Sequence, residues 1–350
     1  MQKTMRVLTF ILAALCAAGA VAQTRIQEPN WRLAEAVEAA SEVDLNANLA
    51  PLFSLARAGS SDELLSALLA LEQREDWPEP ARERVLQAFA QGLGEMPPGS
   101  VDHRVLNYLA AFEPRTLVPN PDYPLAGVPL YNVSASASGA RAAWRRAGAA
   151  RRAEILTSRG PEAWLDAWAG ADAVERRGFV DSLERSSPGW LKAIGDAALQ
   201  RSVEEHAAAP VAARAAILLD DREMLHGAMR EVRGPELTEI LRSAADALDA
   251  ADRVALLEST LHDAPAESGA LAMAILAPGL VHQAAVQDAL FATLGDPGLG
   301  SSAALVLSRS GDESIRRRLS ELAQTGQSVA ARRAALAREA WQGDRPGNER

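Results

Sequence analysis

The residues best suited to chemistry in this sequence are histidines and paired carboxylates. The five histidines are His103, His206, His226, His262 and His282. No two of them are three or four residues apart, the spacing that would place both on one helix face for a metal ion. The acidic groups at 204–205, 220–221 and 246–252 could act as acid and base pairs. Each group adjoins an expected helix end, where capping and solvation explain it.

Motifs that mark known catalytic sites are missing from the chain. It has no His-Glu-x-x-His, no Gly-x-Ser-x-Gly, no glycine-rich phosphate loop and no EF-hand run. We therefore predict no catalytic residue, no cofactor and no metal ion. The sequence favours a non-catalytic role and leaves an enzymatic one open.

Two groups of side chains are candidates for an interaction surface. Trp164 and Trp168 are four residues apart and share a helix face, where they would stack on a sugar or a partner, or would instead fill the core. Arg316, Arg317 and Arg318 stand between two inward-facing aliphatic residues and should face water. In an acidic protein such arginines could dock an acidic partner, although a merely solvated helix face explains them as well.

The elements that must position these residues are amphipathic helices. Ser60 to Glu63 fits a capping box, with Glu63 reaching back to the start of the helix, and a leucine-rich apolar face follows. Prolines interrupt the helical pattern from 113 to 139, and a Ser/Ala run ends this stretch. We predict an ordered non-helical crossing segment there, with a short strand near 128–133 and with Tyr123 and Leu125 packed on a helical surface.

A repeat becomes visible after residue 200. Residues 211–219 closely match residues 329–337, and Ala-rich helical stretches lie between them. Anchor residues at the ends of these stretches are spaced by 27 to 32 residues: Ile217, Leu248, Ile275, Leu307 and Leu336. A second helix follows each of the first four anchors. Two helices repeated at this period are typical of an α-solenoid.

The stretch 201–341 resembles HEAT-like repeats of the short, Ala-rich bacterial kind. The matching residues are 211–214 with Ala216, 311–313, and 329–332 with Ala335 and Leu336. The middle repeats lack the arginine. The resemblance implies a superhelical stack of antiparallel helix pairs that binds another macromolecule along one face. The predicted organisation is a signal peptide (1–22), an N-terminal helical region (23–112), the crossing segment (113–139), divergent repeats (140–200), HEAT-like repeats (201–341) and a disordered tail (342–350).

The first 22 residues read as a cleavable secretory signal. Lys3 and Arg6 precede an apolar run that is too short to span a bilayer, which takes about 20 residues, and the Ala20-Val21-Ala22 sequence suits cleavage before Gln23. Cleavage would change the net charge from −10 to −12 and would remove Cys16, which is the only cysteine. Such an acidic chain without thiols argues against nucleic-acid binding and disulfides. We expect a protein without a membrane span that is periplasmic or secreted, with periplasm favoured.

The sequence is compatible with two functions. The first is an exported, non-catalytic helical-repeat scaffold that binds another protein of the cell envelope. The alternative is a glycan- or peptidoglycan-associated helical protein, of the α/α-toroid or superhelical-domain type, with or without enzymatic activity. Residues 335–341 are loosely similar to the start of the catalytic segment of periplasmic lytic transglycosylases, but the module itself is absent from the sequence.

Overall fold

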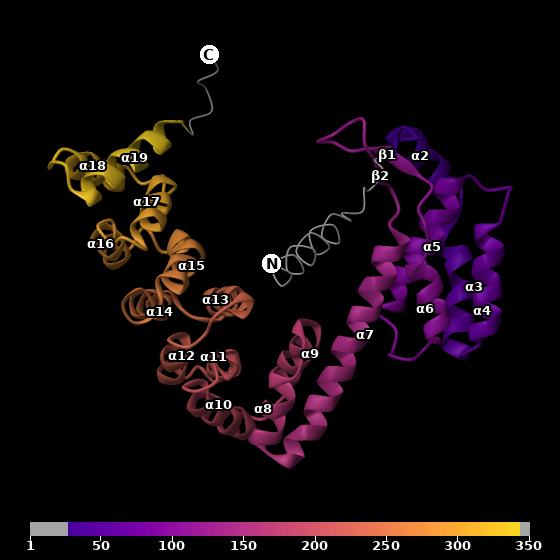
Figure 1. Cartoon of the computed structure of the whole chain (residues 1–350), viewed down its shortest axis with the longest axis horizontal. Coiled ribbons are helices and arrows are strands. Elements are labelled where there is room, and N and C mark those ends of the chain that lie inside the picture. The colour runs from indigo at the N-terminus through magenta and orange to yellow at the C-terminus, as the bar shows by residue number, and fades with distance from the viewer. Residues whose placement is uncertain (1–26, 344–350) are drawn as a thin grey trace, which may run out of the picture. The chain divides into compact units, whose positions relative to one another are not determined.

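The computed structural model describes residues 27–343, and this range is almost entirely helical (Figure 1). It contains eighteen α-helices, three short 3₁₀ helices and one two-stranded sheet. The chain divides into two compact units, with unit 1 ending at Arg145 and unit 2 beginning at Arg146, inside helix α7 (Val133–Leu156). The predicted all-α fold is confirmed. The predicted signal peptide lies outside the described residues, and so does the predicted tail 342–350 from residue 344 onward. Its first two residues, 342 and 343, are helical and end α19 (Val329–Gly343), so the tail begins later than predicted.

Unit 1 is built around helix α5. Its elements are α2 (Leu33–Ser41), α3 (Leu45–Ala58), α4 (Ser61–Glu72), α5 (Glu79–Leu93), α6 (His103–Ala110), β1 (Leu117–Pro119) and β2 (Gly127–Pro129). Helix α5 contacts α2, α3, α4 and α6. Its buried residues, which include Val85, Leu86, Phe89 and Leu93, cover more than one side of the helix. A helix that is apolar on most sides must be enclosed by others, which explains its central place.

The predicted capping box at Ser60 is not formed. Ser60 does stand at the N-cap of α4, but its side chain makes no capping bond. The hydroxyl of the next residue, Ser61, instead accepts a hydrogen bond from the backbone N–H of Asp102 at 3.1 Å. The start of α4 is therefore tied to the start of α6, and a tertiary contact takes the place of the local one.

The segment between α6 and α7 forms a small antiparallel hairpin. Strands β1 and β2 pair in register, with Val118 opposite Val128. The predicted strand is thus present, shifted toward Gly127. The expectation that Tyr123 and Leu125 pack on a helix was wrong, because they lie in the hairpin loop and are 72% and 87% exposed.

The predicted non-helical segment 113–139 ends early, because α7 already begins at Val133. The side-chain oxygen of Asn132 accepts a hydrogen bond from the N–H of Ala135 at 2.9 Å, which caps the helix. An Asn cap followed by alanines favours a helix. The Ser/Ala run at 133–139 is therefore the first part of α7.

The residues before α2 are hydrogen-bonded to the hairpin. The side chain of Asn30 donates to the carbonyl of Arg115 at 2.8 Å and accepts from the N–H of Leu117 at 2.9 Å. Nearby, the buried carboxylate of Glu83 accepts from the N–H groups of Arg115 and Thr116 at 2.5 and 3.1 Å. Burial raises the pKa of Glu83, although these bonds oppose the shift. Strand β1 is thus held from two sides by side-chain oxygens.

Replacing Asn30 with alanine is expected to loosen β1. The change removes two hydrogen bonds, each contributing about 1 kcal/mol, and leaves the Leu117 amide without an acceptor. Hydrogen exchange at the Leu117 amide should therefore become faster. Asn48→Ala is the control, because the Asn48 side chain bonds only to the carbonyl of Asp44 next to its own helix. Unchanged exchange at Leu117 in Asn30→Ala would contradict this role.

Unit 2 consists of consecutive helices in two layers, which we call the odd and even layers after their labels. After the end of α7 come η1 (Thr157–Arg159), α8 (Pro161–Ala169), α9 (Ala173–Glu184), α10 (Pro188–Ser202), η2 (His206–Ala208), α11 (Ala209–Leu219), α12 (Arg222–Met229), α13 (Pro235–Ala247), α14 (Ala250–Asp263), α15 (Ala266–Leu276), η3 (Ala277–Gly279), α16 (Ala284–Thr293), α17 (Gly300–Ser308), α18 (Glu313–Ala323) and α19 (Val329–Gly343). Each odd helix from α9 to α17 contacts the next odd helix, and α10, α12 and α14 each contact the next even helix (Figure 1). This solenoid-like order is the arrangement that the repeat predicts.

The five predicted anchors fall on successive odd helices or at their ends, from α11 to α19. Their burial differs, however, since Leu307 is fully buried whereas Leu336 is 63% exposed. A turn at 311–312 separates α17 from α18: Gly311 has a φ of 72°, and Asp312 caps α18 through the N–H of Ser314 at 2.8 Å. The repeat is therefore regular in its helices and irregular in its side chains.

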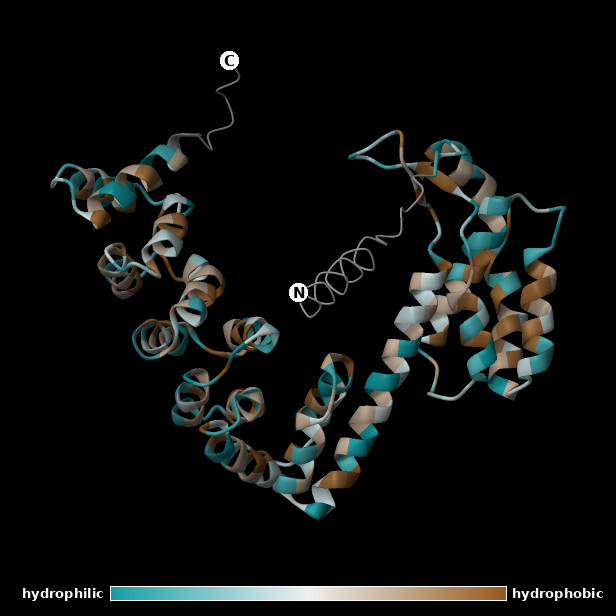
Figure 2. Cartoon of the chain, viewed as in Figure 1, coloured by the Kyte–Doolittle hydropathy of each residue, from teal (hydrophilic) through white to brown (hydrophobic). Residues whose placement is uncertain are grey.

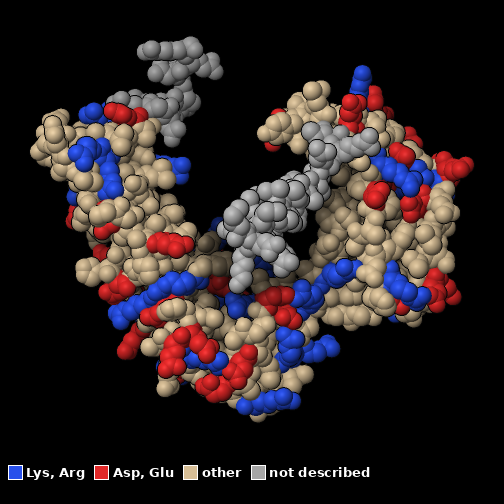
Figure 3. Space-filling view, viewed as in Figure 1, with Lys and Arg blue, Asp and Glu red and all other residues tan. Residues whose placement is uncertain are grey.

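Alanine allows the layers of unit 2 to pack closely. In α11, seven of eleven residues are buried and five of these seven are alanines. Hydrophobic and hydrophilic residues alternate along the helices of unit 2 (Figure 2). On the face shown in Figure 3, acidic and basic side chains are interspersed. No helix among residues 27–343 has the length and apolar content that crossing a lipid bilayer requires.

Candidate binding recess on helices α9, α11 and α13

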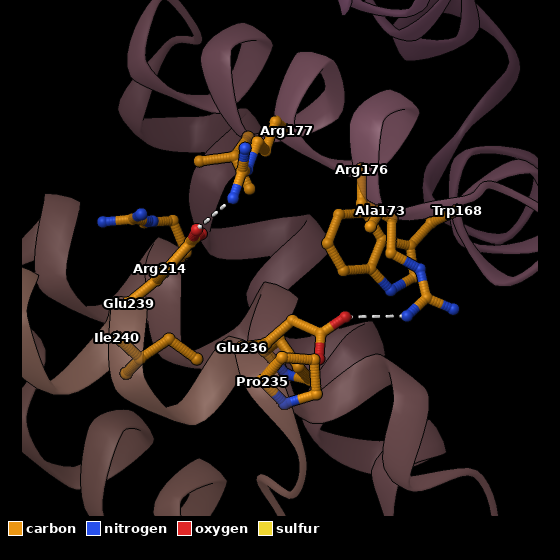
Figure 4. A pocket seen from close by; sticks show the side chains of 11 residues that line it. Trp168, Ala173, Arg176, Arg177, Arg214, Pro235, Glu236, Glu239 and Ile240 are labelled. Carbon is orange, nitrogen blue, oxygen red and sulfur yellow. Dashed lines mark hydrogen bonds and ion pairs between the residues drawn. The ribbon is translucent and has the colours of Figure 1, made fainter. Parts of the chain in front are cut away.

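One recess of unit 2 lies across the odd helices α9, α11 and α13, and Trp168 of α8 also lines it (Figure 4). We call it the α11 recess. It is lined by Trp168, Ala173, Arg176, Arg177, Val180, Pro210, Arg214, Pro235, Glu236, Glu239 and Ile240. Its volume is about 520 Å³, including the solvent-filled space at its mouth. Apolar side chains form the floor, and arginines and glutamates form the rim.

The three helices start in ways that fix the lining residues. Helix α9 begins with a capping box, in which Asp172 accepts from the N–H of Glu175 at 3.1 Å and Glu175 bonds back to the Asp172 N–H. Helix α13 has Pro235 in its first turn, directly after Gly234 at a φ of 76°. Proline is suited to the first turn because the missing N–H has no helical partner there. The arginines of α9 and the glutamates of α13 therefore project from well-defined first turns.

Two ion pairs join α9 to α13. Arg176 contacts Glu236 at 2.8 Å, and Arg177 contacts Glu239 at 3.2 Å. Glu236 and Glu239 are three residues apart, so they lie on one face of α13. The Arg176–Glu236 pair is largely covered, with about a quarter of each side chain exposed, whereas the Arg177–Glu239 pair is more open. An exposed pair of this kind contributes about 0–1 kcal/mol, so Arg177 and Glu239 are available to other partners at little cost.

Trp168 and Arg176 form the closed end of the recess. The guanidinium carbon of Arg176 lies 5.3 Å from the centre of the Trp168 ring. The indole N–H of Trp168 donates to the carbonyl of Ala207 at 2.7 Å, which sets the orientation of the ring. The Nε atom of Arg176 is buried and has no hydrogen-bond partner. This end of the recess therefore combines a fixed aromatic surface with a positive charge.

Arg214 marks the middle of the recess on α11. It belongs to the repeated 211–214 sequence and hydrogen-bonds to the hydroxyl of Ser243 on α13. Its counterpart in the second copy, Arg332, donates to the carbonyl of Gln327 in its own loop at 2.9 Å. The two matching arginines thus have different hydrogen-bond partners, and Arg214 lines the α11 recess.

The predicted surface tryptophans are core residues. Trp164 and Trp168 are 0% and 2% exposed, so the alternative that they fill the core is confirmed. Trp164 stacks beside Trp168 with 6.0 Å between ring centres, and Phe179 meets Trp164 edge-on at 4.8 Å. Of the two tryptophans, Trp168 lines the α11 recess and Trp164 does not.

The predicted arginine triplet lies on α18, in the even layer, and takes no part in the recess. Arg318 contacts Asp288 at 2.9 Å and covers the ring of Phe291. Arg316 pairs with Glu313 at 3.3 Å. Arg317 faces water as predicted, with 74% of its side chain exposed. Arg317 lies 3.9 Å from Glu321 on the same helix, so all three arginines have an acidic partner within unit 2 and Arg317 is the most exposed of them.

The sequence interpretation missed the residues that do line the recess. Arg176-Arg177 and Glu236-x-x-Glu239 are visible as a pair of like charges and as an i, i+3 repeat. They lie about 60 residues apart, and nothing local connects them. The signal that could have predicted the ion pairs is that the arginines and the glutamates carry opposite charges and lie on helices two repeats apart.

The rim suits binding better than catalysis. Each rim glutamate is matched by an arginine, so neither carboxylate resembles the isolated acid that general acid catalysis uses. The floor accepts an apolar group, and the rim offers both signs of charge beside it. No known family, curated protein or solved structure matches this chain.

Proposed function

We propose that this protein is an exported helical-repeat scaffold of the HEAT-like kind, which holds a segment of another cell-envelope protein on the odd layer of unit 2. The α11 recess carries the proposal, because an apolar floor within a rim of exchangeable charges spans three successive helices there. Stacked helix pairs commonly bind extended partners in this way. The exported location is supported by the leader-like residues 1–22.

The chemistry of the recess indicates the kind of segment it accepts. Its apolar floor has room for a side chain rather than for a large cofactor. Arg177 and Glu239 are exposed at its mouth and are weakly bound to each other. We infer a partner segment with one apolar side chain, flanked by an acidic residue toward α9 and a basic residue toward α13.

A charge exchange tests this proposal. In the double variant Arg177→Glu with Glu239→Arg, the internal ion pair is kept but its direction is reversed. We expect stability to remain unchanged and partner capture to fall by about tenfold, which corresponds to the loss of one charge-assisted contact of about 1.4 kcal/mol. Capture is measured with a photoreactive phenylalanine in place of Ala173, which is exposed and lines the recess.

The control places the same photoreactive group at Arg317, which is exposed on the even layer. A specific partner should crosslink from position 173 only. The same crosslinked proteins from both positions, or full capture by the charge-reversed variant, would contradict the proposal. The alternative function expected from the sequence is association with a glycan, and the features that bear on it lie at the other end of α9.

A further inference from the structure

A second recess lies where α9 ends and α10 begins, and we call it the Trp190 recess. It is lined by Glu154, Thr157, Ser158, Ser182, Arg185, Ser186, Ser187 and Trp190. Its volume is about 820 Å³, including the open solvent at its mouth. Hydroxyl-bearing residues make up five of the eight lining residues, and none of the eight belongs to the α11 recess.

Four of the five hydroxyl groups of this recess already donate their hydrogen within the protein, and the fifth, that of Ser187, accepts from the N–H of Trp190 at 3.3 Å. The four donate to backbone carbonyls three or four residues earlier, at 2.7 to 2.9 Å: Thr157, Ser158, Ser182 and Ser186. A hydroxyl has one hydrogen and two lone pairs. These oxygens therefore act as acceptors toward the recess, and they suit a ligand that brings hydrogen-bond donors.

One ion pair supplies both signs of charge at the recess. Nε and Nη2 of Arg185 contact the same oxygen of Glu154, Oε1, at 3.0 and 2.6 Å. The other carboxylate oxygen of Glu154 keeps its lone pairs for a ligand, and Nη1 of Arg185 keeps its N–H groups. Both side chains are about half exposed. The pair is neutral as a whole, so it favours a neutral ligand with both donors and acceptors over an ion.

Trp190 gives the recess an apolar wall. Its indole Nε1 is buried and has no hydrogen-bond partner, although the residue as a whole is partly exposed. What the ring presents to the recess is therefore carbon. An aromatic surface beside convergent polar groups is typical of ligand sites that need both stacking and hydrogen bonds.

We propose that the Trp190 recess is a binding site for a neutral saccharide. A sugar ring has a C–H face that can lie on the indole and a rim of hydroxyls that can donate to the serine oxygens and to Glu154. The same hydroxyls can accept from Arg185. A phosphate or other anion would meet mainly acceptor oxygens, and a cation would meet Arg185. The recess would give the scaffold a contact with glycan that is independent of the α11 recess.

Titration with chitotriose and maltotriose tests the proposal on the whole protein. The readout is the indole N–H signal of Trp190 in a nitrogen–proton correlation spectrum, assigned with Trp190→Phe. We expect one of these neutral trisaccharides to shift that signal with a dissociation constant in the millimolar range. Glu154→Gln should weaken binding by about tenfold, as for one hydrogen bond to a charged group.

Ser158→Trp is the blocking variant. Ser158 is exposed, so a large side chain there fills the recess without entering the core. Binding should be lost while the melting temperature stays the same, and Glu236→Gln in the α11 recess should bind as the original protein does. The proposal is overturned by the absence of any shift with both trisaccharides, by binding that survives Ser158→Trp, or by a preference for cationic chitosan or anionic galacturonate trimers.

Discussion

Replacing Trp164 with alanine is expected to lower the free energy of unfolding of unit 2 by about 3–5 kcal/mol, the usual cost of emptying a large aromatic site. The side chain is completely buried and lies against Trp168 and Phe179. The cluster joins α8 to α9. The small alanine side chains of the neighbouring helices cannot fill the cavity that the substitution leaves. Urea unfolding followed by far-ultraviolet circular dichroism measures the loss.

A pair of phenylalanine variants separates packing from hydrogen bonding in this cluster. The indole N–H of Trp164 is buried without a partner, whereas that of Trp168 donates to the Ala207 carbonyl. The two changes to phenylalanine remove the same atoms. Trp168→Phe should therefore cost about 1 kcal/mol more than Trp164→Phe, which is the net worth of the hydrogen bond. Equal losses would show that the Ala207 bond contributes nothing.

The second large effect is expected at Gly178 in α9. A Cβ atom built there would lie 2.9 Å from both the Cβ of Ala149 and the N of Ala150, and closer still to the carbonyl oxygen of Arg146. These atoms belong to α7, which packs against α9 with no space for a methyl group. Gly178→Ala should destabilise unit 2 by about 1–3 kcal/mol or more, because backbone atoms must move apart.

Gly148→Ala is the matched control for Gly178→Ala. Gly148 lies in α7 and is exposed, and a Cβ atom there would meet nothing within 4 Å. Alanine is favoured over glycine in a helix by up to about 1 kcal/mol. The control should therefore raise the melting temperature in the same assay that shows a fall for Gly178→Ala. A rise in both variants would mean that α7 and α9 are not in close contact in solution.

The sequence predicted the helices of unit 2 well, because their signals are local and repeated. The repeated spacing of the anchor residues, from Ile217 to Leu336, was enough to place the odd helices from α11 to α19. Local signals failed where a tertiary contact decides the outcome. Ser60 had the pattern of a capping residue, but it makes no cap bond, whereas the Asp172–Glu175 box, which has the same pattern, does form.

The candidate sites were harder to predict than the fold. Tryptophans at i, i+4 share a helix face whether that face is buried or exposed, so the spacing could not decide between core and surface. The α11 recess depends on Arg176 and Glu236, which meet only after two helix pairs have stacked. The Trp190 recess depends on which way serine hydroxyls point, and that follows from the ends of α9 and η1 rather than from the residue types.

The layered contacts of unit 2 have a consequence for its local unfolding. Since most helix contacts in unit 2 are between helices that are adjacent or next but one along the chain, the free energy of opening one end is expected to depend little on the far end. Pairs such as α18 and α19 can fray and re-form while α11 stays closed. A ligand that contacts several odd helices would stabilise all of them against local unfolding, because it must dissociate before any of them opens. Ligand binding would then couple the opening of helices that otherwise open independently.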